Sequence, residues 1–244
     1  MEITERFFLQ DGQWNVIHLP YKPNGFGVFI LGDRTHFVDD QSSFWIQHYG
    51  RNQLLSTIRR EGYTLFQSNL FGKNWGSETA VTYAKQLIHV VLKKEILNEK
   101  IHLIAEGMGG LIALELMESI PEKLRSVAMF NPCLDLQTYI SQEKENKFFY
   151  KHLVKELSNA YNIDEKELDG ATFKTLSDYE SLHPVRIWQR MTNTPYSYQQ
   201  HSRKYEDQRK NTASPIELTF HLADNPYRVN QSVVKFFKAH EKNL

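Results

Sequence analysis

The sequence has little cysteine and no excess of charge of either sign. Cys133 is the single cysteine, so no internal disulfide can form, which fits a reducing compartment and a cytoplasmic location. The 29 basic and 29 acidic residues give a formal net charge of zero. Because no global field draws the chain toward a phosphate backbone, we expect no nucleic-acid partner.

Long apolar runs are also absent. No uninterrupted apolar segment approaches the roughly 18 residues that a membrane-spanning helix requires. Residues 1–6 carry acidic side chains instead of a basic stretch that leads into an apolar run. We therefore expect neither export nor a membrane partner. What the chain does have is 244 residues with 41% hydrophobic content, enough for one large domain.

Short apolar segments alternate with helical patterns through the first half of the chain. Asp11-Gly12 suits the tight turn of an antiparallel hairpin between two strands rich in aromatic and β-branched residues. The later segments alternate as β-α-β units, which predicts a doubly wound, mostly parallel sheet. Strands are predicted at residues 3–9, 14–21, 26–31, 63–67, 101–104 and 126–130, and helices at 53–60, 77–92 and 108–119.

The pattern changes between residues 134 and 213. Polar, helix-like segments rich in Lys, Glu, Gln and Tyr follow one another there, with no apolar strand between them. We interpret residues 134–213 as a helical cap inserted into a core made of residues 1–133 and 214–244. The core resumes with a strand at 216–220 and closes with a helix near 228–240.

The segment Ala105-Glu106-Gly107-Met108-Gly109-Gly110 joins a predicted strand to a predicted helix. A strand, a sharp turn and a helix with Gly-x-Ser-x-Gly at the turn form the nucleophile elbow of the α/β-hydrolases. The chain resembles this superfamily of serine esterases, lipases and aminopeptidases closely over residues 24–133 and more loosely over 214–238. Gly107 stands at the position of the serine. Because glycine has no side-chain nucleophile, acyl-enzyme chemistry fails at its first step.

The same resemblance implies roles for other positions. Gly32-Asp33 lies where the family has the loop that supplies an oxyanion-hole amide, and an acidic Asp33 there would oppose an oxyanion. Asp224 stands at the position of the triad acid. The triad histidine normally follows an eighth strand, and we expect that final strand to be missing. His240 falls within an amphipathic helix and is expected to face solvent.

Several residues near the elbow have two interpretations. Glu106 either points into a pocket as a binding group or forms an ion pair at the surface. Met108 either lines that pocket or fills the cleft. Cys133 follows a strand at the edge that would face the cleft, so it is a relocated nucleophile or a packed core residue. Ser43 and Ser68 are further candidates for a relocated nucleophile. The aromatic residues Trp188, Tyr196, Tyr198 and Tyr205 hold the cap to its core, or stack on a ligand.

These observations predict a degenerate α/β-hydrolase homologue that binds a small molecule or a protein instead of catalysing hydrolysis. Its binding residues would be Gly32, Asp33, Glu106, Gly107, Met108, Cys133 and Asp224, with no metal and no cofactor. The alternatives are an ester or acyl hydrolase with a relocated nucleophile and a structural interaction subunit. A missing final strand would leave residues 216–220 as an unpaired sheet edge, and we expect a second copy or a protein partner to pair with it.

Overall fold

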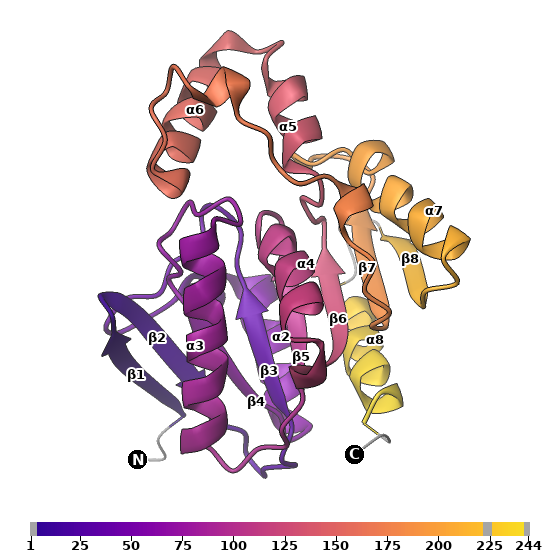
Figure 1. Ribbon diagram of the computed structural model, residues 1–244. Helices are drawn as coiled ribbons and strands as arrows, with labels where there is room; N and C mark the ends of the chain where they lie inside the picture. The colour runs from indigo at the N-terminus through magenta and orange to yellow at the C-terminus, as the bar shows by residue number, and fades with distance from the viewer. Residues whose placement is uncertain (1–3, 222–225, 242–244) are drawn as a thin grey trace.

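The computed structural model describes residues 4–221 and 226–241, with the side chains of residues 226 and 227 excepted. Its centre is one twisted sheet with the strand order β1-β2-β4-β3-β5-β6-β7-β8 (Figure 1). The strands β3 to β8 run parallel, and β2 is antiparallel to both β1 and β4. The strands are β1 (Glu5–Gln10), β2 (Gln13–His18), β3 (Gly27–Leu31), β4 (Thr64–Ser68), β5 (Ile101–Glu106), β6 (Leu124–Phe130), β7 (Val185–Arg190) and β8 (Ile216–His221).

Two of the sequence predictions concern this sheet directly. The hairpin turn lies at Asp11-Gly12, where both residues have positive φ, 46° and 73°. The predicted doubly wound, mostly parallel sheet with an N-terminal antiparallel hairpin is confirmed.

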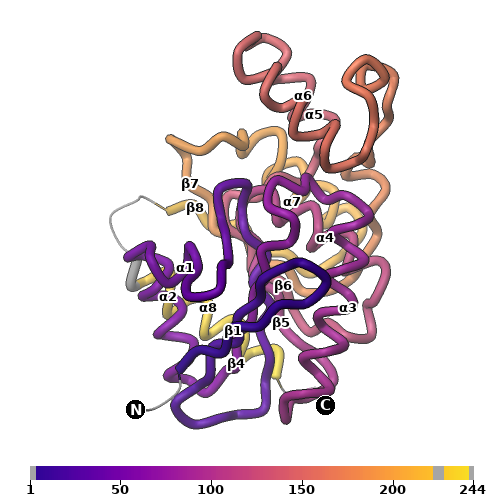
Figure 2. The backbone as a smooth tube through the Cα atoms, turned by 90° about the vertical axis from the view of Figure 1, so that its left-hand side faces the viewer, coloured from indigo at the N-terminus to yellow at the C-terminus, as the bar shows by residue number. Residues whose placement is uncertain are grey.

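Helices cover both faces of the sheet. Figure 2 shows α1 (Phe44–Gln47), α2 (Tyr49–Arg60) and α8 (Pro226–Ala239) on one side and α3 (Glu78–Lys94) and α4 (Gly109–Ser119) on the other. Each layer buries its own apolar cluster. Leu54 and Phe237 belong to the cluster under α2 and α8, whereas Leu87 and Ile112 belong to the larger one under α3 and α4. Burial of these two layers drives the fold.

Residues 131–184 connect β6 to β7 above the carboxyl ends of the parallel strands (Figure 1). They contain α5 (Leu136–Glu143), α6 (Lys147–Tyr161) and two short 3₁₀ turns at Leu168–Gly170 and Leu176–Asp178. A third apolar cluster joins this segment to the start of α4 and the loop before α3. We call residues 131–184 the β6–β7 segment.

The expectation that residues 134–213 contain no strand is wrong. Strand β7 lies inside that range and pairs in parallel with both β6 and β8. The pattern concealed it because Arg186, Gln189 and Arg190 interrupt its apolar residues. Arg186 pairs with Glu217 on β8 at 2.9 Å, and the buried Gln189 accepts a hydrogen bond from Ser202. A helical turn at Gln199–Arg203 and helix α7 (Lys204–Asn211) then lead to β8.

The expectation of a missing final strand is wrong for the same reason. With β7 counted, residues 216–221 form the eighth strand of the sheet instead of the seventh. The division into a core and a cap at residues 134 and 213 stays a prediction. No helix among the described residues is long and apolar enough to cross a membrane.

His102 on β5 gives a pH-dependent test of the packing under α8. Its side chain is fully buried, its Nδ1 lies 2.8 Å from Ser126 Oγ, and its ring stacks on Phe237. Burial, with Arg125 and His240 nearby, lowers the pKa of His102 to about 3. The folded state therefore resists protonation, so stability is complete above the unfolded pKa near 6.5 and declines as the pH falls toward 3.

We expect His102→Gln to flatten this decline, because glutamine keeps a polar group beside Ser126 but does not titrate. Below pH 6.5 the wild-type protein loses about 1.4 kcal/mol per pH unit through this histidine alone. Denaturant unfolding at several pH values between 7 and 4 measures the two slopes. His89→Gln, at an exposed position on α3, is the matched control. Equal slopes for wild type and His102→Gln would contradict the assignment.

Candidate functional site

The turn after β5 has the backbone of a nucleophile elbow. Gly107 has a φ of +52°, in the left-handed region that favours glycine, and α4 begins two residues later. Its amide donates to Phe130 O at 3.1 Å, and its carbonyl accepts from Cys133 N at 2.8 Å. The turn is therefore held against the end of β6.

The two glycines that begin α4 are required by close packing. A Cβ on Gly109 would lie 2.4 Å from Leu31 O, and one on Gly110 would lie 2.6 Å from Cys133 O. Both clashes are with backbone atoms, which cannot move aside without displacing β3 or the start of the β6–β7 segment. These small residues preserve the architecture of the elbow without contributing chemistry.

The Asp33 carboxylate occupies the space above Gly107. A Cβ built on Gly107 would lie 2.1 Å from Asp33 Cγ and 2.2 Å from its Oδ1. A side chain at residue 107 and the observed Asp33 side chain cannot coexist, since real Cβ atoms are not found closer than about 3 Å to a heavy atom. An acidic group thus fills the volume that a nucleophile would need.

Two donors hold this carboxylate in place. Asp33 Oδ1 accepts from the Met108 amide at 2.8 Å and from the Tyr196 hydroxyl at 2.9 Å. In α/β-hydrolases, the amide of the residue after the nucleophile is one of the two that stabilise the oxyanion. Here Met108 follows Gly107, so that amide already serves a carboxylate of the protein. The loop after β3, which supplies the other amide in that fold, supplies Asp33 instead.

Glu106 is an ion-pair residue. Arg51 on α2 donates to both of its carboxylate oxygens, with a distance of 2.6 Å from Nε to Oε2. His36 Nε2 lies 3.8 Å from Oε2. Burial favours the neutral form of Glu106, but Arg51 and His36 outweigh burial and hold its pKa below the ordinary value. This half-buried carboxylate is therefore charged and already satisfied.

His36 lies beside the carboxylates of Glu106 and Asp33. Its ring stacks on Phe44 with 4.0 Å between centroids. Burial lowers the pKa of His36 in spite of the neighbouring Glu106 and Asp33 carboxylates. A neutral imidazole could accept a proton, but the Asp33 carboxylate occupies the space in front of Gly107.

Cys133 is a packed core residue in this structure. Its side chain is fully buried in the apolar cluster of the β6–β7 segment. Burial and the nearby Asp33 carboxylate raise the pKa of the Cys133 thiol well above its ordinary value. Because the thiolate is the nucleophilic form, this environment opposes reactivity.

The two serines considered as relocated nucleophiles have structural contacts. Ser43 is buried and caps α1, where its Oγ accepts from Ile46 N at 3.3 Å and from Gln67 Nε2 at 3.0 Å. Ser68 Oγ accepts from Leu70 N at 3.2 Å. Each hydroxyl stabilises a turn or a helix start next to the sheet.

With β7 included, residues 216–221 form the eighth strand, so different residues follow the seventh and eighth strands than the sequence predicted. In the hydrolase order of serine, acid and histidine, the histidine follows the eighth strand and the acid precedes that strand. The residues after β7 are Met191-Thr192-Asn193-Thr194, which include no carboxylate. The four residues after β8 are Leu222-Ala223-Asp224-Asn225, which include no histidine, and Asp224 lies outside the described residues.

His240 lies near the amino-terminal ends of β5 and β6, whereas the elbow follows the carboxyl end of β5. It lines a surface recess together with Lys100 and Pro121, which precede β5 and β6, and its Nδ1 lies 2.8 Å from Phe236 O. Among the described residues, no group of three or more His, Cys, Asp or Glu side chains is arranged to hold a metal ion.

The elbow is covered by the β6–β7 segment and the loop before α3. Met108 is 1% exposed, and its sulfur accepts from the Trp75 amide at 3.0 Å. Trp75 stacks on Tyr139, which in turn contacts Tyr196. Of the predicted binding residues, the structure thus brings Gly32, Asp33, Gly107, Met108 and Cys133 together under aromatic side chains, with Glu106 turned toward Arg51.

A buried glutamate ties this cover to the core. Glu156 on α6 accepts hydrogen bonds from Arg34 at 2.9 Å, from Lys73 at 2.7 Å and from the Trp75 indole at 3.0 Å. All three donors lie in loops that follow strands of the sheet. The local sequence around Glu156 does not reveal this role, because the partners of Glu156 lie more than 80 residues away in the chain.

No protein-family model and no curated protein sequence matches the chain. Solved structures do. An esterase from Pyrococcus furiosus matches with a TM-score of 0.68 and 13% identity over 98% of this chain and 93% of its own. Est1E from Butyrivibrio proteoclasticus matches with a TM-score of 0.65 and 11% identity over 98% and 99%.

The acylaminoacyl peptidase of Pyrococcus horikoshii matches with a TM-score of 0.67 and 11% identity over 97% of this chain. The chain spans 41% of the length of that peptidase. These similarities, with the strand order, confirm the α/β-hydrolase fold that the elbow motif predicted.

The contact between Asp33 and Gly107 can be tested by a double-mutant cycle. We expect Gly107→Ser to destabilise the protein by about 2 kcal/mol or more, since it combines a left-handed φ with a clash against Asp33. Asp33→Ala removes the clashing group. The double variant should therefore be more stable than the sum of the single effects predicts. Urea unfolding of the four proteins measures the coupling. Strictly additive changes would show that Asp33 does not fill the space above residue 107.

Proposed function

We propose that the protein is a catalytically inactive α/β-hydrolase homologue that acts by binding. One observation carries the proposal: the Asp33 carboxylate fills the volume of the nucleophile and accepts the hydrogen bond of the Met108 amide. A substrate carbonyl would have to displace this charged group before it reached the elbow. It would then meet a glycine with no group to attack it.

The missing triad partners support the same proposal. Between β7 and β8 no carboxylate precedes Glu206, which lies on α7 and is bound by Arg203 and Lys210. The sequence after β8 offers no histidine before His240. Restoring a serine at residue 107 would therefore not by itself rebuild the order of serine, acid and histidine.

The packing above the elbow favours interaction over small-molecule binding at that position. Met108, Trp75, Tyr139 and Tyr196 are all at most 3% exposed and belong to one apolar cluster. A ligand at Gly107 would need to separate these side chains. The fold is then best understood as a scaffold whose partners bind elsewhere on its surface.

Activity-based probes test inactivity. We expect a fluorophosphonate probe to leave the intact mass of the native protein unchanged, because no activated serine faces the elbow. We also expect iodoacetamide to leave Cys133 unmodified in the native protein and to label it after unfolding, since burial keeps the thiol neutral and covered.

The active hydrolases with this fold serve as positive controls for the fluorophosphonate arm. Stoichiometric labelling by either probe, lost on substitution of Ser43, Ser68 or Cys133, would favour the rival function, an ester or acyl hydrolase with a relocated nucleophile. Hydrolysis of an aryl ester by the unlabelled protein would do the same.

Strand β8 gives a second candidate for the binding function. It stands at the end of the strand order and pairs only with β7 within the described chain, so its other side presents backbone groups to a partner strand. Exposed and half-buried residues alternate at its start, and Glu217 is its one acidic residue. We propose that a second copy of the chain pairs there about a two-fold axis.

Light scattering at increasing concentration tests this pairing. We expect the mass to rise from one chain toward two. A monomeric mass at every concentration would exclude self-pairing at β8 and leave a different protein as the partner. This outcome is independent of the probe experiments, since neither labelling reaction involves the sheet edge.

A further inference from the structure

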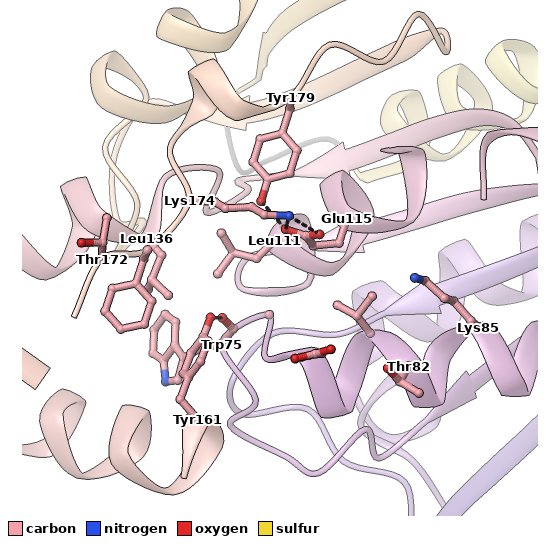
Figure 3. A pocket seen from close by; sticks show the side chains of 14 residues that line it. Trp75, Thr82, Lys85, Leu111, Glu115, Leu136, Tyr161, Thr172, Lys174 and Tyr179 are labelled. Atoms are coloured by element: carbon pink, nitrogen blue, oxygen red, sulfur yellow. Dashed lines mark hydrogen bonds and ion pairs between the residues drawn. The ribbon is translucent and has the colours of Figure 1, made fainter. Parts of the chain in front are cut away.

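A cavity of about 400 Å³ lies beside the elbow but does not include it. It opens between the amino-terminal half of α3, the start of α4 and residues 172–179 of the β6–β7 segment (Figure 3). Neither Asp33 nor Gly107 lines it. The volume falls within the range of small-ligand pockets, which is roughly 300–1,000 Å³.

One end of the cavity is aromatic and rigid. Trp75 and Phe173 are largely buried there, and Tyr161 packs edge-on against Phe173 with 5.0 Å between centroids. The Tyr161 hydroxyl donates to Trp75 O at 2.8 Å, which fixes the two rings relative to each other. Leu111 and Leu136 complete this end. The wall suits one apolar or aromatic side chain.

The middle of the cavity contains a satisfied ion pair. Glu115 on α4 binds the Lys174 ammonium at 2.7 Å and accepts from the Tyr179 hydroxyl at 2.8 Å (Figure 3). Burial and the nearby Glu115 carboxylate raise the pKa of Tyr179, so its proton stays in place as a donor. These three groups neutralise one another and leave no charge for a ligand.

Two other charged residues lining the cavity make no ion pair within the described chain. Glu78 is exposed and lies in the first turn of α3, three residues after Trp75 in the chain, and Lys85 is half-buried farther along the same helix. Figure 3 shows Lys85 on the opposite side of the cavity from Trp75 and Tyr161. The free charges are thus of opposite sign and lie at different ends.

Their spacing matches a short peptide. Seven residues along a helix complete about two turns and rise about 10.5 Å, so both side chains lie on one face of α3. Three extended residues span at most about 10–11 Å between their ends. A carboxylate beside an aromatic wall at one end and an ammonium at the other complement a free amino terminus, an apolar first side chain and a free carboxyl terminus.

We propose that this cavity binds a free tripeptide with an apolar first residue. Glu78 holds the terminal ammonium, the aromatic end takes the first side chain, and Lys85 holds the terminal carboxylate. Binding here requires neither a nucleophile nor displacement of Asp33. It goes beyond the proposed loss of catalysis and does not depend on it.

The test uses the tripeptide Phe-Gly-Gly and three relatives: its N-acetyl form, its C-terminal amide and Gly-Gly-Gly. Each relative removes one of the three complementary groups. Amide chemical shifts of Gly76, Thr82 and Lys174 report binding at the cavity. We expect saturable shifts with Phe-Gly-Gly and about three- to tenfold weaker binding for each charge-deleted form, since each loses one solvent-accessible ionic contact.

Matched variants assign each contact. Lys85→Met should weaken binding of Phe-Gly-Gly about three- to tenfold but leave the affinity of the C-terminal amide unchanged, because the amide has already lost that contact. Glu78→Gln should show the same pattern with the N-acetyl form. Lys93→Met, farther along α3 and outside this cavity, is the control that should bind like the wild type.

Three results would overturn the proposal. One is the absence of saturable shifts up to about 10 mM Phe-Gly-Gly, which corresponds to binding weaker than about 3 kcal/mol. Another is equal binding of the free acid and the amide, and the third is an equal loss in Lys85→Met and Lys93→Met. Such a failure would leave the probe results at the elbow unchanged, so the two proposals fail separately.

Discussion

The Asp33 carboxylate can lie over residue 107 only because glycine has no Cβ there. The surrounding loops contact one another through this carboxylate. A charged group this close to a strand end needs donors, and the Met108 amide and the Tyr196 hydroxyl provide them. The contact joins the loop after β3, the elbow after β5 and the loop after β7. It makes these three loops one hydrogen-bonded unit.

The β6–β7 segment extends this unit. Glu156 collects three donors from core loops, and Met108 and Trp75 meet under Tyr139. A buried carboxylate is costly without such partners, so these three contacts hold α6 against the loops after β3 and β4. The apolar cluster then excludes water from the elbow. The hydrogen bonds of Glu156 position α6 against the core loops, and burial of the apolar cluster supplies the favourable free energy.

The sequence predicts the parts of the fold in which local pattern and burial agree. The apolar runs of β3, β5 and β6 and the small residues around Gly107 each reveal their structure over a few residues. Strand β7 has no such signal, because Arg186 and Gln189 interrupt its apolar residues. These two side chains are satisfied by Glu217 and Ser202, which lie outside the strand and which the local sequence does not reveal. Without β7 among the predicted strands, residues 216–221 count as the seventh strand instead of the eighth. The position of Asp33 over Gly107 depends on a contact across 74 residues, which periodicity cannot reveal.

The elbow also shows how the groups around Gly107 are satisfied in the folded chain. Active sites hold strained backbone and poorly satisfied polar groups at a cost in stability. In this protein the positive φ at the elbow falls on a glycine, and the oxyanion amide has a permanent acceptor. Trp75 connects the elbow to the cavity beside α3, because its amide donates to the Met108 sulfur and its side chain lines the cavity. The contacts that cover the elbow therefore also shape the neighbouring cavity, since Glu156 and Tyr139 hold the Trp75 ring that forms its wall.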